Sequence, residues 1–402
     1  MHNTILEKSV SRFGSPLYVY DLNFLKSRAA HLYSTFFRAG IDVLYAVKAN
    51  SNAFILKALC DLGFSFDACS VGEVLLLLKI GVNPRLIHFN ADGVSLDEMR
   101  ELSCTNVNLT VGSIDHLRLL VHKKVEWRNS ITLRINTGFG AGHSPAVVTG
   151  GDMSKFGISI ADMPIVRAFC EREGICVSGL HAHAGSGIDE ISDYVENARR
   201  LIDVAHIWAD SLDSLNFGGG LPYEYGGGHQ EFDCEEMANR LIELTRTLRE
   251  KSPLLRLMIE PGRCVVAGSG VLLCTVTSSK TQGARKYITV DSGFNHLARP
   301  FLYGAYHQID NISASENAKT IVCDIVGNLC QSGDVFARDR EIHEAKVGDL
   351  LCIRDVGAYG YSMASNYNSR PRPAEVAISN EGLILIRNRE TFEELFCRQN
   401  LG

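Results

Sequence analysis

The chain has 402 residues, of which 46% are hydrophobic and 21% charged, a composition typical of globular proteins that excludes a disordered or fibrous chain. Its formal net charge of −6 provides no general basic field, so we expect neither nucleic acid nor a membrane as a partner. At roughly 150 residues per domain, the length predicts two or three domains, or a barrel with one further domain.

The N-terminal residues and the cysteines favour a cytoplasmic protein. The first residues contain no apolar segment of signal-peptide length, and no apolar run approaches the roughly 20 residues that span a bilayer. The 12 cysteines are scattered singly without a Cys-x-x-Cys pair, so we expect neither a paired zinc site nor a disulfide framework. We therefore predict reduced cysteines, a cytoplasmic location and no bound metal.

From about residue 42 to residue 262, short apolar runs alternate with amphipathic segments. The apolar runs, expected as buried strands, are residues 42–48, 65–70, 85–90, 108–113, 130–136, 177–183, 214–220 and 255–260. The helical patterns are residues 54–62, 72–80, 115–123, 163–172, 191–212 and 235–249. Eight right-handed βαβ units close most naturally into a (β/α)8 barrel, with a doubly wound open sheet as the alternative.

After residue 262 the pattern changes to β-rich runs separated by turn residues. These runs are residues 271–279, 286–291, 320–326, 350–355, 375–379 and 383–387. They predict a mainly antiparallel β domain, to which residues 16–20 are expected to add a strand. We therefore predict a barrel domain of residues 25–265 and a β domain of residues 1–24 plus 266–402.

The residues that close the barrel strands are the candidates for chemistry, because active sites of such barrels lie at the carboxyl ends of the strands. The first run closes on Lys48. Desolvation at the barrel mouth lowers the pKa of an amine, and a neutral amine is the nucleophile that forms a Schiff base. The alternative is a lysine that extends its ammonium group into water.

Two histidines, His181 and His183, close the sixth run and point to the same side of a strand. A metal pair is one interpretation, but no third ligand has a convincing spacing. An imidazole stacked on a flat cofactor fits better, and the small residues up to Gly187 allow a ligand to approach the backbone.

The last two strands end in groups that suit an anionic aromatic ligand. Gly218, Gly219 and Gly220 follow the seventh run and could present bare N–H groups to an anion, although a tight turn would also explain them. Glu260 and Arg263 follow the eighth run, where a carboxylate could hold a protonated pyridine nitrogen and a guanidinium could bind phosphate; an ion-paired turn is the alternative. Together with Lys48, these groups describe a pyridoxal 5'-phosphate site.

Several motifs resemble those of the alanine-racemase-fold (fold type III) pyridoxal-phosphate decarboxylases. They are YAVKAN at residues 45–50, HAHAGSG at 181–187, GGG at 218–220, EPGR at 260–263 and GAYG at 357–360. Within this group the chain most resembles the diaminopimelate decarboxylase family. That finer resemblance rests on INTGFGAGHS at 135–144, TGG at 149–151, SKFGI at 154–158 and SNYNSRP at 365–371.

The resemblance implies roles for individual residues. The cofactor-binding residues would be Lys48, His183, Ser186, Gly218, Gly219, Gly220, Glu260, Arg263 and Tyr359. The substrate-binding residues would be Arg263, Arg299, Tyr303, Gln331 and Tyr359. Cys330 would be the acid–base residue, reaching with Tyr359 into the site of a neighbouring subunit, which implies a homodimer with shared active sites. The β domain would thus contribute substrate-binding and dimer-interface residues.

The implied reaction is decarboxylation of meso-2,6-diaminopimelate to L-lysine. One position departs from the family. Its members have the motif CESGD, whereas this chain has CQSGD at residues 330–334. The family's glutamate faces the distal ammonium of the substrate, and Gln331 lacks its charge. A paralogous decarboxylase of another amino acid or amino-acid conjugate is therefore the main alternative. A non-catalytic cofactor-binding relative and a racemase of the same fold fit less well, because Lys48, Cys330 and the EPGR motif are all present.

Overall fold

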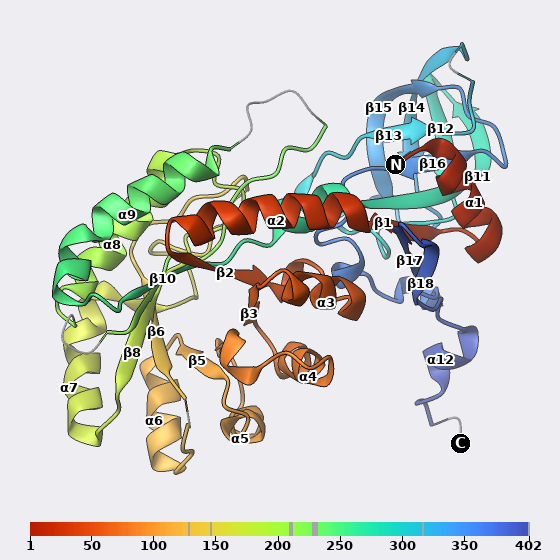
Figure 1. Ribbon diagram of the computed structural model, residues 1–402. Coiled ribbons are helices and arrows are strands. Elements are labelled where there is room, and N and C mark those ends of the chain that lie inside the picture. Colours follow the sequence, from red (N-terminus) through yellow and green to blue (C-terminus); the bar gives the residue numbers. More distant parts are fainter. Residues whose placement is uncertain (128, 145–146, 209–211, 227–231, 316, 401–402) are drawn as a thin grey trace. The chain divides into compact units, whose positions relative to one another are not determined.

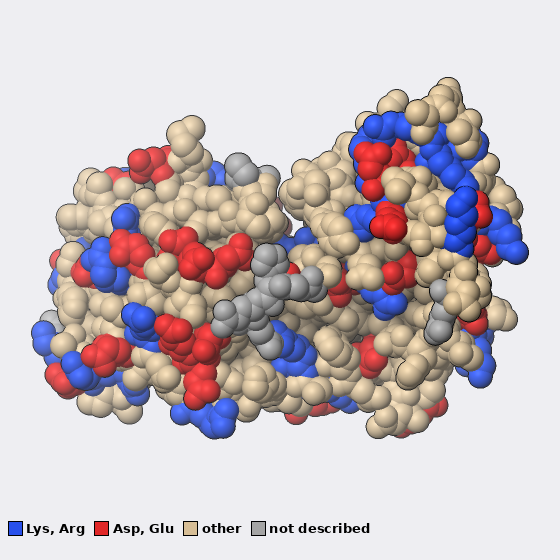
Figure 2. All heavy atoms as spheres, turned by 90° about the horizontal axis from the view of Figure 1, so that it is seen from above, with Lys and Arg blue, Asp and Glu red and all other residues tan. Residues whose placement is uncertain are grey.

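The computed structural model describes the chain except residues 128, 145–146, 209–211, 227–231, 316 and 401–402 (Figure 1). The chain divides into two compact units. The first consists of Met1–Ser27, Glu224–His229 and Val265–Gly402, and the second of Arg28–Tyr223 and Gln230–Cys264. We refer to them as the β unit and the barrel unit. Lys and Arg side chains are interspersed with Asp and Glu in both units on the face that Figure 2 displays.

The barrel unit contains a closed barrel of eight parallel strands. They are β2 (Ile41–Ala46), β3 (Ser65–Ala68), β4 (Ile87–Asn90), β5 (Asn108–Val111), β6 (Ile131–Asn136), β8 (Val177–His181), β9 (Ser214–Asn216) and β10 (Arg256–Ile259). Adjacent strands pair in the order β5-β4-β3-β2-β10-β9-β8-β6, and the pairing of β5 with β6 closes the ring. The predicted (β/α)8 barrel is therefore confirmed, and the open-sheet alternative was wrong. A short strand, β7 (Ile158–Ser159), pairs with β6.

Helices follow the barrel strands in the expected alternation. They are α3 (Ala53–Asp61), α4 (Val71–Lys79), α5 (Leu96–Ser103), α6 (Ile114–His122), α7 (Met163–Glu173), α8 (Ile191–Ala205) and α9 (Cys234–Lys251). Side chains of Asn52, Ser70 and Ser113 cap the N-termini of α3, α4 and α6 by accepting backbone N–H bonds, which explains where these helices begin. The helix expected over 191–212 ends at Ala205, and residues 209–211 lie outside the described part. Helix α5, which begins with a Ser95–Glu98 capping box, was not predicted.

The β unit is built on a mixed, mostly antiparallel sheet. Its strands are β1 (Leu17–Asp21), β11 (Gly270–Gln282), β12 (Arg285–Val290), β13 (Ile309–Asn311), β14 (Thr320–Val326), β15 (Val335–His343), β16 (Leu350–Ile353), β17 (Ala374–Ser379) and β18 (Gly382–Arg387). The path runs β15-β14-β12-β11-β1-β17-β18, with β16 paired to both β11 and β13. Among the strand pairs that the described residues form in this sheet, only β1–β17 and β12–β14 are parallel. The N-terminal run thus joins this sheet as predicted, whereas β13 and β15 were missed.

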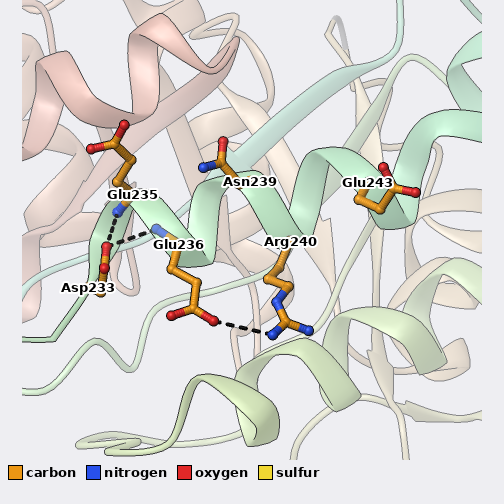
Figure 3. A pocket seen from close by; sticks show the side chains of 6 residues that line it. All are labelled: Asp233, Glu235, Glu236, Asn239, Arg240 and Glu243. Carbon is orange, nitrogen blue, oxygen red and sulfur yellow. Dashed lines mark hydrogen bonds and ion pairs between the residues drawn. The ribbon is translucent and has the colours of Figure 1, made fainter.

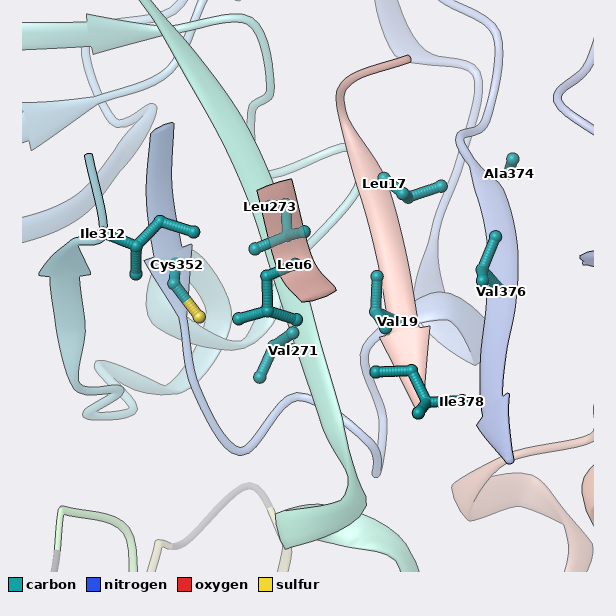
Figure 4. Packing of buried hydrophobic residues seen from close by; sticks show 10 residues of the cluster. All are labelled: Leu6, Leu17, Val19, Val271, Leu273, Ile312, Cys352, Ala374, Val376 and Ile378. Atoms are coloured by element: carbon teal, nitrogen blue, oxygen red, sulfur yellow. The ribbon is translucent and has the colours of Figure 1, made fainter. Parts of the chain in front are cut away.

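Buried apolar side chains cover one face of the β-unit sheet. Leu17 and Val19 of β1 pack between Val271 and Leu273 of β11 and residues of β17 (Figure 4). Leu6 reaches this cluster from α1 (Asn3–Phe13), a helix that we did not predict. The remaining helices include α2 (Leu22–Arg38), α10 (Arg263–Val266), α11 (Arg299–Tyr303) and α12 (Phe392–Phe396). No helix among the described residues is both long and apolar enough to cross a membrane.

Candidate active site

Lys48 lies in a 3-10 turn (Val47–Ala49) directly after β2 and faces an acidic strand end. Its Nζ is 3.5 Å from Oδ2 of Asp67 on β3 and 3.7 Å from Sγ of Cys69. Asp67 is fully buried and also accepts a 2.5 Å hydrogen bond from the amide of Asn90. The Lys48 side chain is 39% exposed. The candidate Schiff-base lysine therefore lies beside a buried carboxylate.

Glu260, which follows β10, is a buried carboxylate held by two side-chain donors. Its Oε2 is 3.1 Å from Nε2 of His181, and its Oε1 accepts a 2.7 Å bond from the amide of Asn216. Burial raises the pKa of Glu260, but the hydrogen bond from His181 and the charge of Lys48 outweigh this effect and hold the pKa far below its ordinary value. The barrel therefore contains an ionised carboxylate that is only 5% exposed.

The imidazole of His183 is fixed by the glycine turn after β9. The N–H of Gly219 donates a 3.1 Å hydrogen bond to Nδ1 of His183. Burial lowers the pKa of His183 well below its ordinary value, with Lys48 and Arg134 acting in the same direction. His183 is therefore a neutral ring with its proton on Nε2, as suits a group that stacks on a flat ligand.

The glycine triplet differs in one respect from the expectation of bare N–H groups. The N–H of Gly218 donates to Oδ1 of Asn216 over 2.9 Å, and that of Gly219 is used by His183. The triplet is needed for close packing, since a Cβ on Gly219 would lie 2.1 Å from the carbonyl oxygen of Glu260. Gly218 and Gly220 also have positive φ angles of 73° and 112°, which favour glycine.

Ser186 and Arg263 lie together in the barrel unit. Nη2 of Arg263 donates a 2.8 Å hydrogen bond to Oγ of Ser186, which pairs a guanidinium with a hydroxyl as a phosphate site requires. Thr149 and Gly150 are bonded to the segment that carries Ser186. The carbonyl oxygen of Ala184 accepts from the N–H groups of Thr149 and Gly150 at 3.0 and 3.1 Å.

The predicted residues of the β unit differ in burial and are described in two groups, the first half-buried or buried and the second exposed. Arg299 begins α11, where its Nη1 is 2.8 Å from Nε2 of His307 and its guanidinium lies 4.2 Å from the centre of the Tyr225 ring. Arg299 is almost completely buried, and Tyr303, the last residue of α11, is half-buried. Tyr359 is also half-buried and has a φ of 56°, which is uncommon for an aromatic residue.

Cys330 and Gln331 form the second group, and both are exposed. The backbone N–H of Cys330 donates to Oδ1 of Asn368 over 3.0 Å, and the hydroxyl of Tyr367 donates to Oε1 of Gln331 over 3.0 Å. The SNYNSRP motif therefore supports the CQSGD motif directly, a link that separate motifs in the sequence did not reveal.

The structure adds residues that the sequence analysis missed or assigned differently. Three missed residues contact a predicted site residue or its partner: Asp67, Asn90 and Asn216. Each lies in a predicted strand, and that position was the feature of the sequence that could have identified them. His181, considered above as half of a metal pair, contacts Glu260 instead. Among the described residues, no group of three or more metal-ligating side chains forms a metal site.

Two hollows in the barrel unit contain none of the predicted catalytic side chains. One, of about 500 Å³, lies along α9 (Figure 3) and is lined by Asp233, Glu235, Glu236, Asn239, Arg240 and Glu243. Asp233 caps α9 and Glu236 pairs with Arg240 at 3.2 Å, so helix capping and the helix dipole account for these charges. The other, of about 630 Å³, lies beside the N-terminus of α6 and includes Asn136 and Ser154.

The barrel side chains fit pyridoxal phosphate. The deciding observation is Glu260, because a buried ionised carboxylate is the group that holds a protonated pyridine nitrogen. Lys48 is near enough to influence the pKa values of both Glu260 and His183, so the amine, the neutral ring and the carboxylate belong to one site.

Residues 25–267 match the family described as "Pyridoxal-dependent decarboxylase, pyridoxal binding domain". The chain is therefore a pyridoxal-phosphate-dependent decarboxylase, a carboxy-lyase. It is 36% identical to the diaminopimelate decarboxylase of Methanothermobacter thermautotrophicus over 397 residues, covering 97% of this chain and 92% of that protein. It is also 36% identical to the Escherichia coli K12 enzyme over 410 residues, covering 97% and 95%. The chain belongs to the diaminopimelate decarboxylase family.

Solved structures agree with this assignment. A crystal structure of a diaminopimelate decarboxylase superposes with a TM-score of 0.91 at 35% identity, covering 98% of this chain and 96% of that one. The Helicobacter pylori diaminopimelate decarboxylase complexed with L-lysine gives a TM-score of 0.89 at 30% identity, covering 98% of both chains.

Proposed function

We propose that this enzyme decarboxylates meso-2,6-diaminopimelate to L-lysine and acts in lysine biosynthesis. The proposal is carried by the conjunction of Lys48 with the ionised Glu260 in a chain that matches diaminopimelate decarboxylases over 97% of its length. The test is CO₂ release from a panel of meso-diaminopimelate, lysine, ornithine, arginine, glutamate and diaminopropionate conjugates. Turnover of meso-diaminopimelate well above the others supports the proposal, and preference for another amino acid contradicts it.

Bound pyridoxal phosphate supplies an electron sink for the pair of electrons that remains when the α-carboxylate leaves as CO₂. Lys48 would hold the aldehyde carbon of the bound cofactor, and His183 would pack against its ring. Glu260 keeps a proton on the pyridine nitrogen, and that proton makes the ring a strong electron acceptor. Ser186, Gly220 and Arg263 bind the phosphate.

The β unit supplies the substrate contacts in this proposal. Arg299 and Tyr303 bind a substrate carboxylate, and the contacts of Arg299 with His307 and Tyr225 hold its guanidinium in one orientation. Cys330 delivers a proton to the α-carbon after CO₂ leaves, and Tyr359 contacts the cofactor phosphate or ring. The proposed division into a barrel domain of 25–265 and a β domain of 1–24 plus 266–402 follows these two sets of roles.

Gln331 supports a second candidate function, the decarboxylation of a related amino acid or amino-acid conjugate. The hydroxyl of Tyr367 donates to its amide oxygen, which leaves the amide N–H₂ as the group directed to other partners. An amide donor suits a neutral or acidic distal group better than an ammonium ion. The same substrate panel separates the two candidates.

We infer that the enzyme is a homodimer whose active sites each include residues of both subunits. Cys330 and Gln331 are exposed on a β unit that also exposes Phe301 and Tyr367, whose ring centres lie 4.5 and 5.2 Å from that of half-buried Phe294. Exposed aromatic side chains are enriched at protein interfaces.

Mixed dimers test this arrangement. Lys48→Ala and Cys330→Ala, each inactive alone, are unfolded and refolded together. If sites are shared, hybrid dimers with one intact site restore about a quarter of wild-type activity. No restored activity in mixtures shown to contain hybrids contradicts shared sites. We also propose a cytoplasmic location, supported by exposed free thiols such as Cys104 and Cys176.

A further inference from the structure

The buried carboxylate of Glu260 receives one hydrogen bond on each oxygen, from a different barrel strand in each case. His181 at the end of β8 contacts Oε2 at 3.1 Å, and Asn216 at the end of β9 contacts Oε1 at 2.7 Å. All three residues are at most 5% exposed. Asn216 also accepts from the N–H of Gly218, so its amide orientation is determined by two bonds.

The contacts of His181 determine where its proton lies. A carboxylate can only accept, so Nε2 of His181 carries a hydrogen and donates it to Glu260. Nδ1 of His181 is buried and has no hydrogen-bond partner among the described residues. A second proton on Nδ1 would bury an unpaired donor and a positive charge, which is costly. The ring therefore donates to Glu260 as a neutral imidazole.

A neutral donor and a charged donor would have different consequences for the cofactor. An imidazolium would form a closed ion pair with Glu260 and compete for its charge with a protonated pyridine nitrogen. A neutral imidazole orients the carboxylate and leaves its full negative charge available.

We propose that His181 is a positioning residue that orients ionised Glu260 toward the protonated ring nitrogen of pyridoxal phosphate without neutralising it. The inference rests on the proposed role of Glu260 in cofactor binding. It assigns His181 a role distinct from that of His183, although the two residues are two apart on the same strand end.

The test compares His181→Leu, which removes the donor, with His181→Gln, whose amide N–H can replace it. Pyridoxal phosphate is titrated into each apoprotein and followed by its visible absorbance between pH 6 and 9, and kcat and KM are measured for meso-diaminopimelate. His181→Leu should weaken cofactor binding and lower kcat by about 10- to 100-fold with little change in KM, the loss expected for a hydrogen bond to a charged group. His181→Gln should remain within about threefold of wild type, the range of a modestly weakened hydrogen bond.

Two controls separate positioning from general damage. His116→Gln alters another histidine of the barrel unit, half-buried on α6, and should leave cofactor affinity unchanged. The double variant His181→Leu/Glu260→Gln should be no worse than Glu260→Gln alone, because His181 acts through Glu260. If His181→Leu does not fold, His181→Asn replaces it, since asparagine is too short to reach Glu260.

The imidazole protonation state is measured directly by ¹⁵N NMR of the apoprotein, with the His181 signals assigned by their loss in His181→Gln. One protonated and one bare nitrogen are expected, and two protonated nitrogens would overturn the inference. Unchanged cofactor affinity and spectrum in His181→Leu would overturn it as well. Failure of the proposed function can be told apart from failure of this inference. In the first case wild-type protein would bind the cofactor without decarboxylating meso-diaminopimelate, and the comparison of cofactor affinities would still test the role of His181.

Discussion

The backbone N–H of Gly219 donates a hydrogen bond to Nδ1 of His183 over 3.1 Å. This contact joins the turn after β9 to the end of β8 and determines which ring nitrogen of His183 carries the proton. Gly219 also packs against the carbonyl of Glu260 at the end of β10. One glycine thus aligns three strand ends that carry proposed cofactor contacts.

Gly219→Ala should disrupt this alignment. The new Cβ would lie 2.1 Å from the carbonyl oxygen of Glu260. This oxygen belongs to the backbone, so relieving the clash would require a shift of the strand end. We expect a loss of about 1–3 kcal/mol in the free energy of unfolding, measured with urea, together with reduced cofactor content. The control is Gly72→Ala, whose Cβ would be 3.8 Å from its nearest neighbour, Oγ of Ser70, and should cost nothing. Equal effects of the two substitutions would contradict the steric explanation.

Lys48→Ala should remove the visible absorbance of the bound cofactor and abolish decarboxylation, because no other amine would hold the aldehyde carbon. The measurement is the visible spectrum of purified protein with added pyridoxal phosphate. Lys57→Ala, on the neighbouring helix α3, should leave colour and activity intact. Wild-type colour in Lys48→Ala would exclude Lys48 as the covalent contact.

Cys330→Ala should retain the cofactor yet lose turnover by about 10²- to 10⁴-fold, the contribution typical of a positioned acid. The visible spectrum and kcat are compared in the same preparation. Cys397→Ala removes another exposed thiol and provides the control. Wild-type turnover in Cys330→Ala would remove this residue from the mechanism.

Gln331→Glu should raise kcat/KM for meso-diaminopimelate by about tenfold, because a carboxylate binds an ammonium ion more strongly than an amide does. Tyr367→Phe, which removes the hydroxyl that donates to Gln331, shows how much of the change comes from reorienting this side chain. A neutral or harmful effect of Gln331→Glu would favour a substrate with a different distal group.

His296 should make the stability of the protein depend on pH. Its Nε2 donates to the carbonyl of Pro371 and its Nδ1 accepts from Ser292, and burial lowers its pKa to about 4. The unfolded chain, with a histidine pKa of about 6.5, binds the proton first as pH falls, so the stabilisation present above pH 6.5 is lost toward pH 4. The contribution to the free energy of unfolding should be about 2 kcal/mol smaller at pH 5 than at pH 8. His296→Gln should reduce this pH dependence, and an identical dependence in urea titrations of both proteins would contradict the assignment.

Local patterns in the sequence were sufficient to predict the barrel, the β sheet that includes the N-terminal run, and the strand ends that carry Lys48, His183 and Glu260. These predictions depend on hydrophobic periodicity and on the rule that parallel strands present their carboxyl ends on one side. Elements without a clear apolar period were missed. The strand β15, for example, carries Arg338, Asp339, Arg340 and Glu341 in its middle.

Only the tertiary structure decided how the strand-end residues are paired. Positions along the chain could not predict that His181 bonds to Glu260 or that Asn216 links Glu260 to the glycine turn. Nor could they predict that the N–H groups of Gly218 and Gly219 bond within the protein. Residue types and strand ends are local properties of the sequence. Which side chains meet depends on the neighbours and register of β8, β9 and β10 in the closed barrel, where residues separated by 36–79 positions come within hydrogen-bonding distance.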